Sequence, residues 1–201
     1  YFNDAIDNWD TTLVTNMSEM FFQAQAFSGN IGSWITSSVE NMASMFSGAT
    51  VFNSNISSWD TISVTDMRNM FYEALAFNKQ LTSWAVFGVK NFSFMFYGAT
   101  AFNGGNSVNY GSPLNWNTSA AENMASMFEG AVEFIGNISA WNTSNVTNMS
   151  RMFYDARKFQ NPIGLWDTIL VTNMNSMFKD ANEFNQNIGS WNTIDVEDMN
   201  S

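Results

Sequence analysis

The sequence predicts an α/β repeat solenoid of about eight coils, similar in geometry to a leucine-rich repeat, with short parallel strands on one face and short helices on the other. Three observations support this prediction. A 25-residue spacing recurs along the 201-residue chain, and phenylalanine, tryptophan and methionine recur in phase with it. Within each unit, an aromatic and β-branched stretch is followed by apolar residues at helical spacing. Repeats of about 20–29 residues with one strand and one helix are typical of leucine-rich repeats.

Tryptophan sets the period. The gap between successive tryptophans is 25 residues, except at the fourth interval, where it is 32 and seven residues are added. The added residues fall within 104–113, a stretch rich in Gly, Asn and Ser that we expect to form a surface loop. The eight tryptophans are Trp9, Trp34, Trp59, Trp84, Trp116, Trp141, Trp166 and Trp191.

One phenylalanine per unit keeps the same register and marks where repeats 1 to 8 begin. We therefore expect one solenoid domain over 1–201, as part of a longer array. The starting residues are Phe2, Phe27, Phe52, Phe77, Phe102, Phe134, Phe159 and Phe184.

The second half of each repeat predicts a helix of about three turns. In repeat 6, Val146, Met149, Met152, Phe153 and Ala156 stand at offsets of 0, 3, 6, 7 and 10, which places them on one helical stripe. So short a helix is not stable alone, and it must pack against its neighbours. Helical spacing also indicates that the Met-Phe pairs belong to the core rather than to a soft binding surface.

The first half of each repeat, which reads F-N-x-N-I-x-x-W, predicts a strand and a following turn, because it is rich in aromatic and β-branched residues. The spacing of Phe, Ile and Trp does not alternate strictly, so it does not decide the face on which Trp lies. A buried column, with each indole N–H bonded to a carbonyl, is favoured over an exposed ladder for sugars.

The string V-T-N-M-S-x-M-F resembles repeats of surface lipoproteins from mycoplasma and Listeria, which are related to BspA-like leucine-rich repeats. Its clearest copies are 146–153 and 14–21. The resemblance covers the chain apart from the insertion. It implies a leucine-rich-repeat-like solenoid on a secreted or cell-surface protein, with functions that are mostly adhesion or interaction. It implies no catalytic residue.

Composition excludes several classes of function. The formal net charge is −11, which disfavours binding to nucleic acid and to anionic membranes. The chain has no cysteine and no histidine, so thiolate sites and the commonest acid–base group are absent. No apolar run is long enough to span a membrane. Carboxylate pairs such as Glu129 with Glu133, or Asp195 with Glu197, are expected to be ordinary solvated charges. We expect no enzyme activity, no metal and no cofactor.

Two polar columns have both a structural and a functional interpretation. An asparagine ladder that satisfies turn backbone groups is favoured over stacked calcium sites, because no repeat has calcium-loop spacing. A column of threonines, interrupted by Val86, is expected to cap turns rather than to bind ice. The asparagine ladder comprises Asn16, Asn41, Asn91, Asn123, Asn148 and Asn173, with Asp66 and Asp198 in the remaining places.

The chain carries eight N-x-S/T glycosylation sequons. Asn117, Asn142 and Asn145 are the better candidate acceptors, because they lie in the predicted turn. The sequons at the ladder residues Asn16, Asn91 and Asn148 are expected to be too buried for modification.

The leading functional hypothesis is a non-enzymatic extracellular or cell-surface module for adhesion, which binds a protein or glycan through its sheet face or the 104–113 loop. The alternative is a structural subunit of a filament, sheath or surface layer that self-associates end to end, because no polar cap is visible at either end of the solenoid. Ice binding is a weaker alternative.

Overall fold

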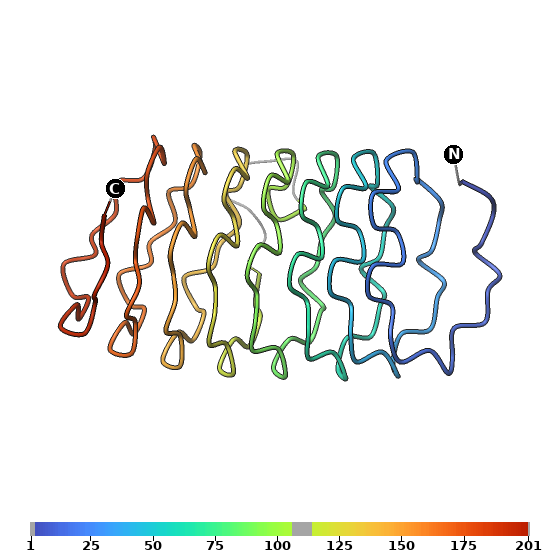
Figure 1. Ribbon diagram of the computed structural model, residues 1–201, viewed down its shortest axis with the longest axis horizontal. Coiled ribbons are helices and arrows are strands. Elements are labelled where there is room, and N and C mark those ends of the chain that lie inside the picture. The colour runs from blue at the N-terminus through green and yellow to red at the C-terminus, as the bar shows by residue number, and fades with distance from the viewer. Residues whose placement is uncertain (1–2, 106–113, 201) are drawn as a thin grey trace.

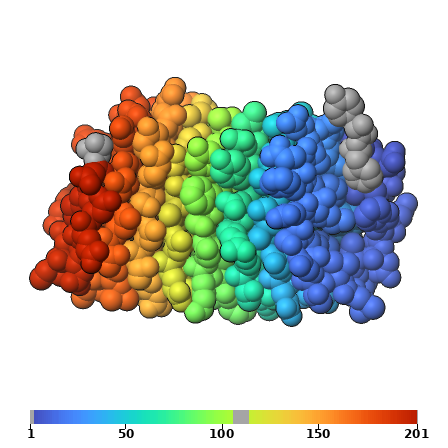
Figure 2. All heavy atoms as spheres, viewed as in Figure 1, coloured from blue at the N-terminus to red at the C-terminus, as the bar shows by residue number. Residues whose placement is uncertain are grey.

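The computed structural model describes residues 3–105 and 114–200, and there the chain winds into a stack of coils, one for each repeat. Figure 1 shows the coils side by side from the N-terminal end, in blue, to the C-terminal end, in red. Figure 2 shows that they pack into an elongated body. Equivalent residues of successive repeats therefore lie next to one another.

The predicted α/β architecture is wrong, and with it the leucine-rich-repeat geometry. The described residues contain no helix, and their strand-like pairing consists of isolated parallel bridges that form no sheet. These bridges lie in the half of the repeat predicted to be helical, whereas the half predicted to be a strand contains turns and irregular chain. The bridges run from Asn16 to Asn41, Asp66, Asn91, Asn123, Asn148, Asn173 and Asp198 in succession.

The segment from the bridging Asn or Asp to the alanine eight residues later is a series of tight turns, here called the turn ladder (41–49 in repeat 2). Its N–H groups alternate between two kinds of acceptor. The N–H of Ser44 donates to the Arg68 carbonyl of the next repeat at 2.9 Å, whereas that of Met45 donates to the Met42 carbonyl of its own repeat at 3.2 Å. This alternation recurs through repeats 1–6, and it satisfies the backbone without a helix.

These turns place a left-handed residue at every fourth position. Glycine fills three of these places, Gly48, Gly98 and Gly130, with φ between 63° and 73°. A chain that turns every fourth residue also returns side chains to one side at intervals of three and four, so the apolar spacing imitates a helix. The non-glycine residues with positive φ are Glu19, Gln23, Ser44, Asn69, Glu73, Phe94, Ser126, Arg151, Asp155, Ser176 and Asp180.

The other half of the repeat, from Phe to Val, is joined to its neighbours by side-chain donors and is here called the bridging half (27–39 in repeat 2). The Trp34 indole N–H donates to the Ile6 carbonyl of the previous repeat at 2.9 Å. The Thr36 hydroxyl donates to the Asp60 carbonyl of the next repeat at 2.8 Å. Side chains therefore do in this half what the backbone does in the turn ladder.

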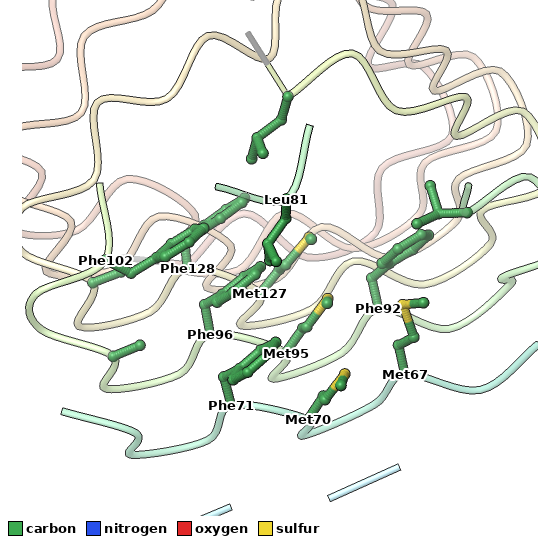
Figure 3. Close-up of a cluster of buried hydrophobic side chains, with 14 of the residues drawn as sticks. Met67, Met70, Phe71, Leu81, Phe92, Met95, Phe96, Phe102, Met127 and Phe128 are labelled. Carbon is green, nitrogen blue, oxygen red and sulfur yellow. The ribbon is translucent and has the colours of Figure 1, made fainter. Parts of the chain in front are cut away.

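The core consists of stacked aromatic and methionine rows. The ring centroids of Phe71 and Phe96 lie 5.4 Å apart, and Phe96 lies 4.0 Å from Phe102 with nearly parallel planes. Each stacked pair contributes about 0.5–1.5 kcal/mol beyond the burial of its surface. Figure 3 shows two of the rows, Phe71, Phe96 and Phe128 beside Met70, Met95 and Met127.

The repeat resumes after the insertion with its core register intact. Leu114 is buried in the place of the usual isoleucine, and Trp116 donates its indole N–H to the Leu81 carbonyl at 2.8 Å. A side chain at Gly105, where the insertion leaves the coil, would collide with the backbone of Gln80. The rest of the predicted 104–113 loop, residues 106–113, lies outside the described residues.

Candidate functional site

The asparagine column is part of the turn backbone. The Oδ1 atom of Asn41 accepts the N–H of Ala43 at 2.9 Å, and Asn148 accepts the N–H of Ser150 in the same way. Each column member from Asn16 to Asp198 does so, which makes one Asx turn per repeat. Among the described residues, no group of three or more acidic side chains is placed to hold a metal ion.

The tryptophan and threonine columns lie inside the solenoid. The tryptophans of repeats 2–7 are 2–4% exposed, and their indole N–H groups donate to carbonyls of the preceding repeat. Trp9, in repeat 1, is half exposed. The threonines of repeats 1–3 and 5–7 are 1–4% exposed, and their hydroxyl groups donate to carbonyls of the next repeat.

The three favoured sequon asparagines, Asn117, Asn142 and Asn145, are exposed on the outside of the bridging half. The first two use Oδ1 to cap a turn, and the Nδ2 of Asn145 donates to the Ser119 carbonyl at 2.7 Å. The expectation of burial at the ladder sequons is wrong for Asn16, which is exposed, while Asn91 and Asn148 are half-buried.

Several outward columns of the turn ladder change their residue type along the chain, and one of them leads to the candidate site. It follows the core phenylalanine directly, and its side chains lie outside the core. Its members in repeats 1–7 are Phe22, Ser47, Tyr72, Tyr97, Glu129, Tyr154 and Lys179. Because the core does not fix this column, it is free to carry residues with another role.

Three aromatic residues of repeats 3 and 4, Tyr72, Phe94 and Tyr97, form a cluster that we call the aromatic platform. The rings of Tyr72 and Tyr97 stack with centroids 4.5 Å apart. Phe94 lies 6.0 Å from Tyr97 at an angle of 53°, and 37% of its surface is exposed. Burial raises the pKa of Tyr72 above its ordinary value of 10.0, and Tyr97 and Glu73 raise it further.

An ion pair with a buried carboxylate stands beside the platform. Glu129 is only 5% exposed, and Arg151 of the next repeat binds it with two N–H groups, the Nε–Oε2 distance being 2.8 Å. This hydrogen bonding raises the pKa of Arg151 above its ordinary value. The guanidinium also lies 4.1 Å above the ring of Tyr154. The expectation that Glu129 is an ordinary solvated carboxylate is therefore wrong.

Two grooves, each of about 520 Å³, share Tyr97 and Glu129 in their walls. The first groove lies toward the start of the turn ladder and is lined by the aromatic platform, Glu129, Arg151, asparagines and serines. The second lies toward its end and is lined by Leu75, Tyr154 and several charged residues. Such surfaces can stack against a ligand and exchange hydrogen bonds with it.

The family described as "Mycoplasma protein of unknown function, DUF285" matches residues 1–110 and again 104–201. The chain belongs to this family. The DUF285 matches confirm the mycoplasma repeat resemblance in its broad form, although the leucine-rich-repeat part of it is not supported. No curated protein and no solved structure matches the chain.

The DUF285 repeat pattern conceals the candidate site, because a consensus removes the differences between repeats. Phe94 stands where other repeats have Ser, Asn, Glu or Arg, and Glu129 stands in a column that is otherwise mostly aromatic. The sequence signal was this departure from the usual residues. A second sign was Arg151, which stands shortly before Tyr154, the residue of the next repeat equivalent to Glu129. Within the described residues, no helix is long and apolar enough to cross a membrane.

Proposed function

We propose that this chain is a non-enzymatic module of a secreted or cell-surface protein, which mediates adhesion by binding a partner through the first groove. The main support is that Phe94, Glu129 and Arg151, which depart from the usual residues of their columns, line one groove together with the other platform aromatics. Stacked repeats offer long surfaces for binding. The resemblance to surface lipoproteins of mycoplasma and Listeria, and membership of the DUF285 family, fit this location.

The chemistry of the groove supports binding rather than catalysis. Its one buried carboxylate, on Glu129, is held by Arg151, and the chain has no histidine or cysteine to act as a base or nucleophile. Aromatic rings, amides and hydroxyl groups remain, which are typical of recognition surfaces.

The test is adhesion of beads coated with the purified chain to epithelial cell monolayers. We expect adhesion by the parent chain and its loss in the double variant Phe94→Ser, Tyr97→Ser, which installs residues found in the same columns of other repeats. The matched control is Phe22→Ser, an exposed aromatic of the Tyr97 column outside both grooves. Equal adhesion by all three proteins, with circular dichroism showing them folded, would contradict the proposal.

End-to-end assembly is the second candidate, favoured by the face of repeat 8. A groove of about 600 Å³ there is lined by core-column residues, among them Met177, Phe178, Trp191 and Met199. Another coil of the same design would cover these side chains. Sedimentation that shows a monomer at every concentration would exclude self-assembly of this segment.

A further inference from the structure

We infer that the first groove binds a neutral oligosaccharide. This inference rests on the proposed function and names the ligand class of the same site. It is carried by three features of the groove: its balanced charge, its angled aromatic walls, and its supply of hydrogen-bonding groups.

The charge of the first groove is balanced internally. Glu129 and Arg151 are the charged residues in its lining, and they bind each other. A partner that depends on ionic contacts, such as a basic peptide or a sulfated glycan, would have to compete with this bidentate pair. The net charge of −11 further disfavours acidic glycans. A neutral ligand encounters neither obstacle.

The aromatic walls suit the apolar faces of a sugar ring. Phe94 and Tyr97 stand at 53° to each other and so form a corner, with Tyr72 stacked behind Tyr97. Phe94 adopts a φ of 59°, which is unfavourable for a bulky side chain, and yet its ring remains 37% exposed. The backbone imposes this φ on the whole column, where Ser or Asn would fit more easily. An exposed phenylalanine there gains nothing from the core, and strained residues of this kind cluster at functional sites.

The polar lining suits hydroxyl groups, which both donate and accept hydrogen bonds. Three serines, Ser93, Ser126 and Ser150, line the groove beside the aromatic platform. Asn123 and Asn148 also line it, and because their Oδ1 atoms cap turns, their NH₂ groups are the donors they can offer to a ligand. A volume of about 520 Å³ accommodates a short oligosaccharide better than a large globular partner.

The test is titration of the chain with neutral hexose oligosaccharides of three to six units, in parallel with sulfated oligosaccharides and with neutral and basic peptides. Binding is followed by calorimetry. We expect binding to at least one neutral oligosaccharide, weakened about tenfold or more by Phe94→Ser, Tyr97→Ser and unchanged by Phe22→Ser. Raising the salt concentration should leave this affinity unchanged, because no ionic contact is involved.

The outcomes separate the inference from the proposed function. Binding of peptides or sulfated sugars alone, lost in the double variant, would overturn the inference and leave the adhesion module standing. Binding of neutral oligosaccharides that survives the double variant would also overturn it, because the sugar would then lie elsewhere. No platform-dependent binding of any probe, together with unchanged adhesion of the double variant, would overturn both.

Discussion

The two halves of each repeat are joined to their neighbours by different chemistry. In the turn ladder the backbone forms the bonds between coils, as in the Phe46 N–H to Met70 carbonyl contact of 2.9 Å. In the bridging half, side chains form them, as in the Ser58 hydroxyl to Gly32 carbonyl bond of 2.8 Å and the Trp and Thr bonds. A residue that bonds through its backbone keeps that bond when its side chain changes, whereas a residue that bonds through its side chain loses it, as at Leu165 in the column of Ser58.

The side-chain bonds of the bridging half coincide with two nearly constant columns. The Trp and Thr columns of the bridging half are almost constant, with Val86 as the exception in the second. The outward columns of the turn ladder change at nearly every repeat, and they supply the aromatic platform and the pair of Glu129 with Arg151. Outward columns of the bridging half vary as well, as Ser37, Ile62 and Phe87 show in one column, but the stacked aromatic platform lies in the turn ladder.

The largest predicted loss of stability follows from a substitution in the bridging half. Trp59→Ala should lower the free energy of unfolding by about 3–5 kcal/mol, because it removes a buried indole that stacks on Trp34 and Trp84 and bonds to Ile31. Tyr154→Ala, in the variable column of the turn ladder, should lower the free energy of unfolding by clearly less. Urea unfolding of both variants tests the comparison, and equal losses would contradict it.

The next largest loss of stability is predicted for the ion pair in the turn ladder. Arg151→Met leaves the Glu129 carboxylate buried without a partner and should cost about 2 kcal/mol, less than for a fully buried pair because Arg151 is partly solvated. Lys158→Met is the control, since its pair with Glu133 is half exposed and should contribute little to the free energy of unfolding. Urea unfolding at neutral pH measures both, and similar small losses would show that burial of Glu129 does not matter.

A smaller effect is predicted for the threonine column. Thr143→Val keeps the shape of the side chain but removes the hydroxyl bond of 2.8 Å to the Asp167 carbonyl, and should cost about 1 kcal/mol. Val86→Thr is the reverse change at the one interrupted place, and it should be neutral or stabilising. Thermal unfolding followed by circular dichroism checks both. A stabilising Thr143→Val would show that these hydroxyls do not hold the coils together.

The smallest predicted effect concerns pH. Since the pKa of Tyr72 is raised in the folded state, its contribution to stability is complete below the ordinary value of 10.0 and is lost as pH rises through the folded pKa. Tyr72→Phe should therefore lose less stability than the parent chain between pH 9 and pH 11. Identical pH profiles in urea unfolding would show that this phenol is not perturbed.

The sequence was sufficient for the register of the repeat and for its interior, because periodic Phe, Met and Trp residues identify which positions stack. For local conformation, however, the sequence pattern led to a wrong prediction. Consecutive four-residue turns and an α-helix return apolar residues to the same side at the same intervals, so spacing cannot distinguish them. Gly48, Gly98 and Gly130 in a single column were the available sign of a left-handed turn, since glycine is unfavourable in a helix interior.

The candidate site could be found only in part. The burial of Glu129 depends on Arg151 reaching across from the next coil, and this contact requires the three-dimensional offset between neighbouring columns. The angle between Phe94 and Tyr97 likewise depends on turn geometry that the apolar pattern does not contain. What the sequence did hold was the contrast between these residues and their equivalents in other repeats.

The hydrogen bonds of the turn ladder give the solenoid a direction. From the first core residue of the ladder onward, the earlier repeat donates its N–H groups and the later repeat accepts them, as from Ser44 to Arg68 and from Phe94 to Ala125. Within this part of the turn ladder, one face of every coil therefore presents backbone donors and the opposite face presents backbone acceptors. Any further coil or copy that continues this ladder must join head to tail, so growth by this route is open-ended rather than a closed symmetric pair.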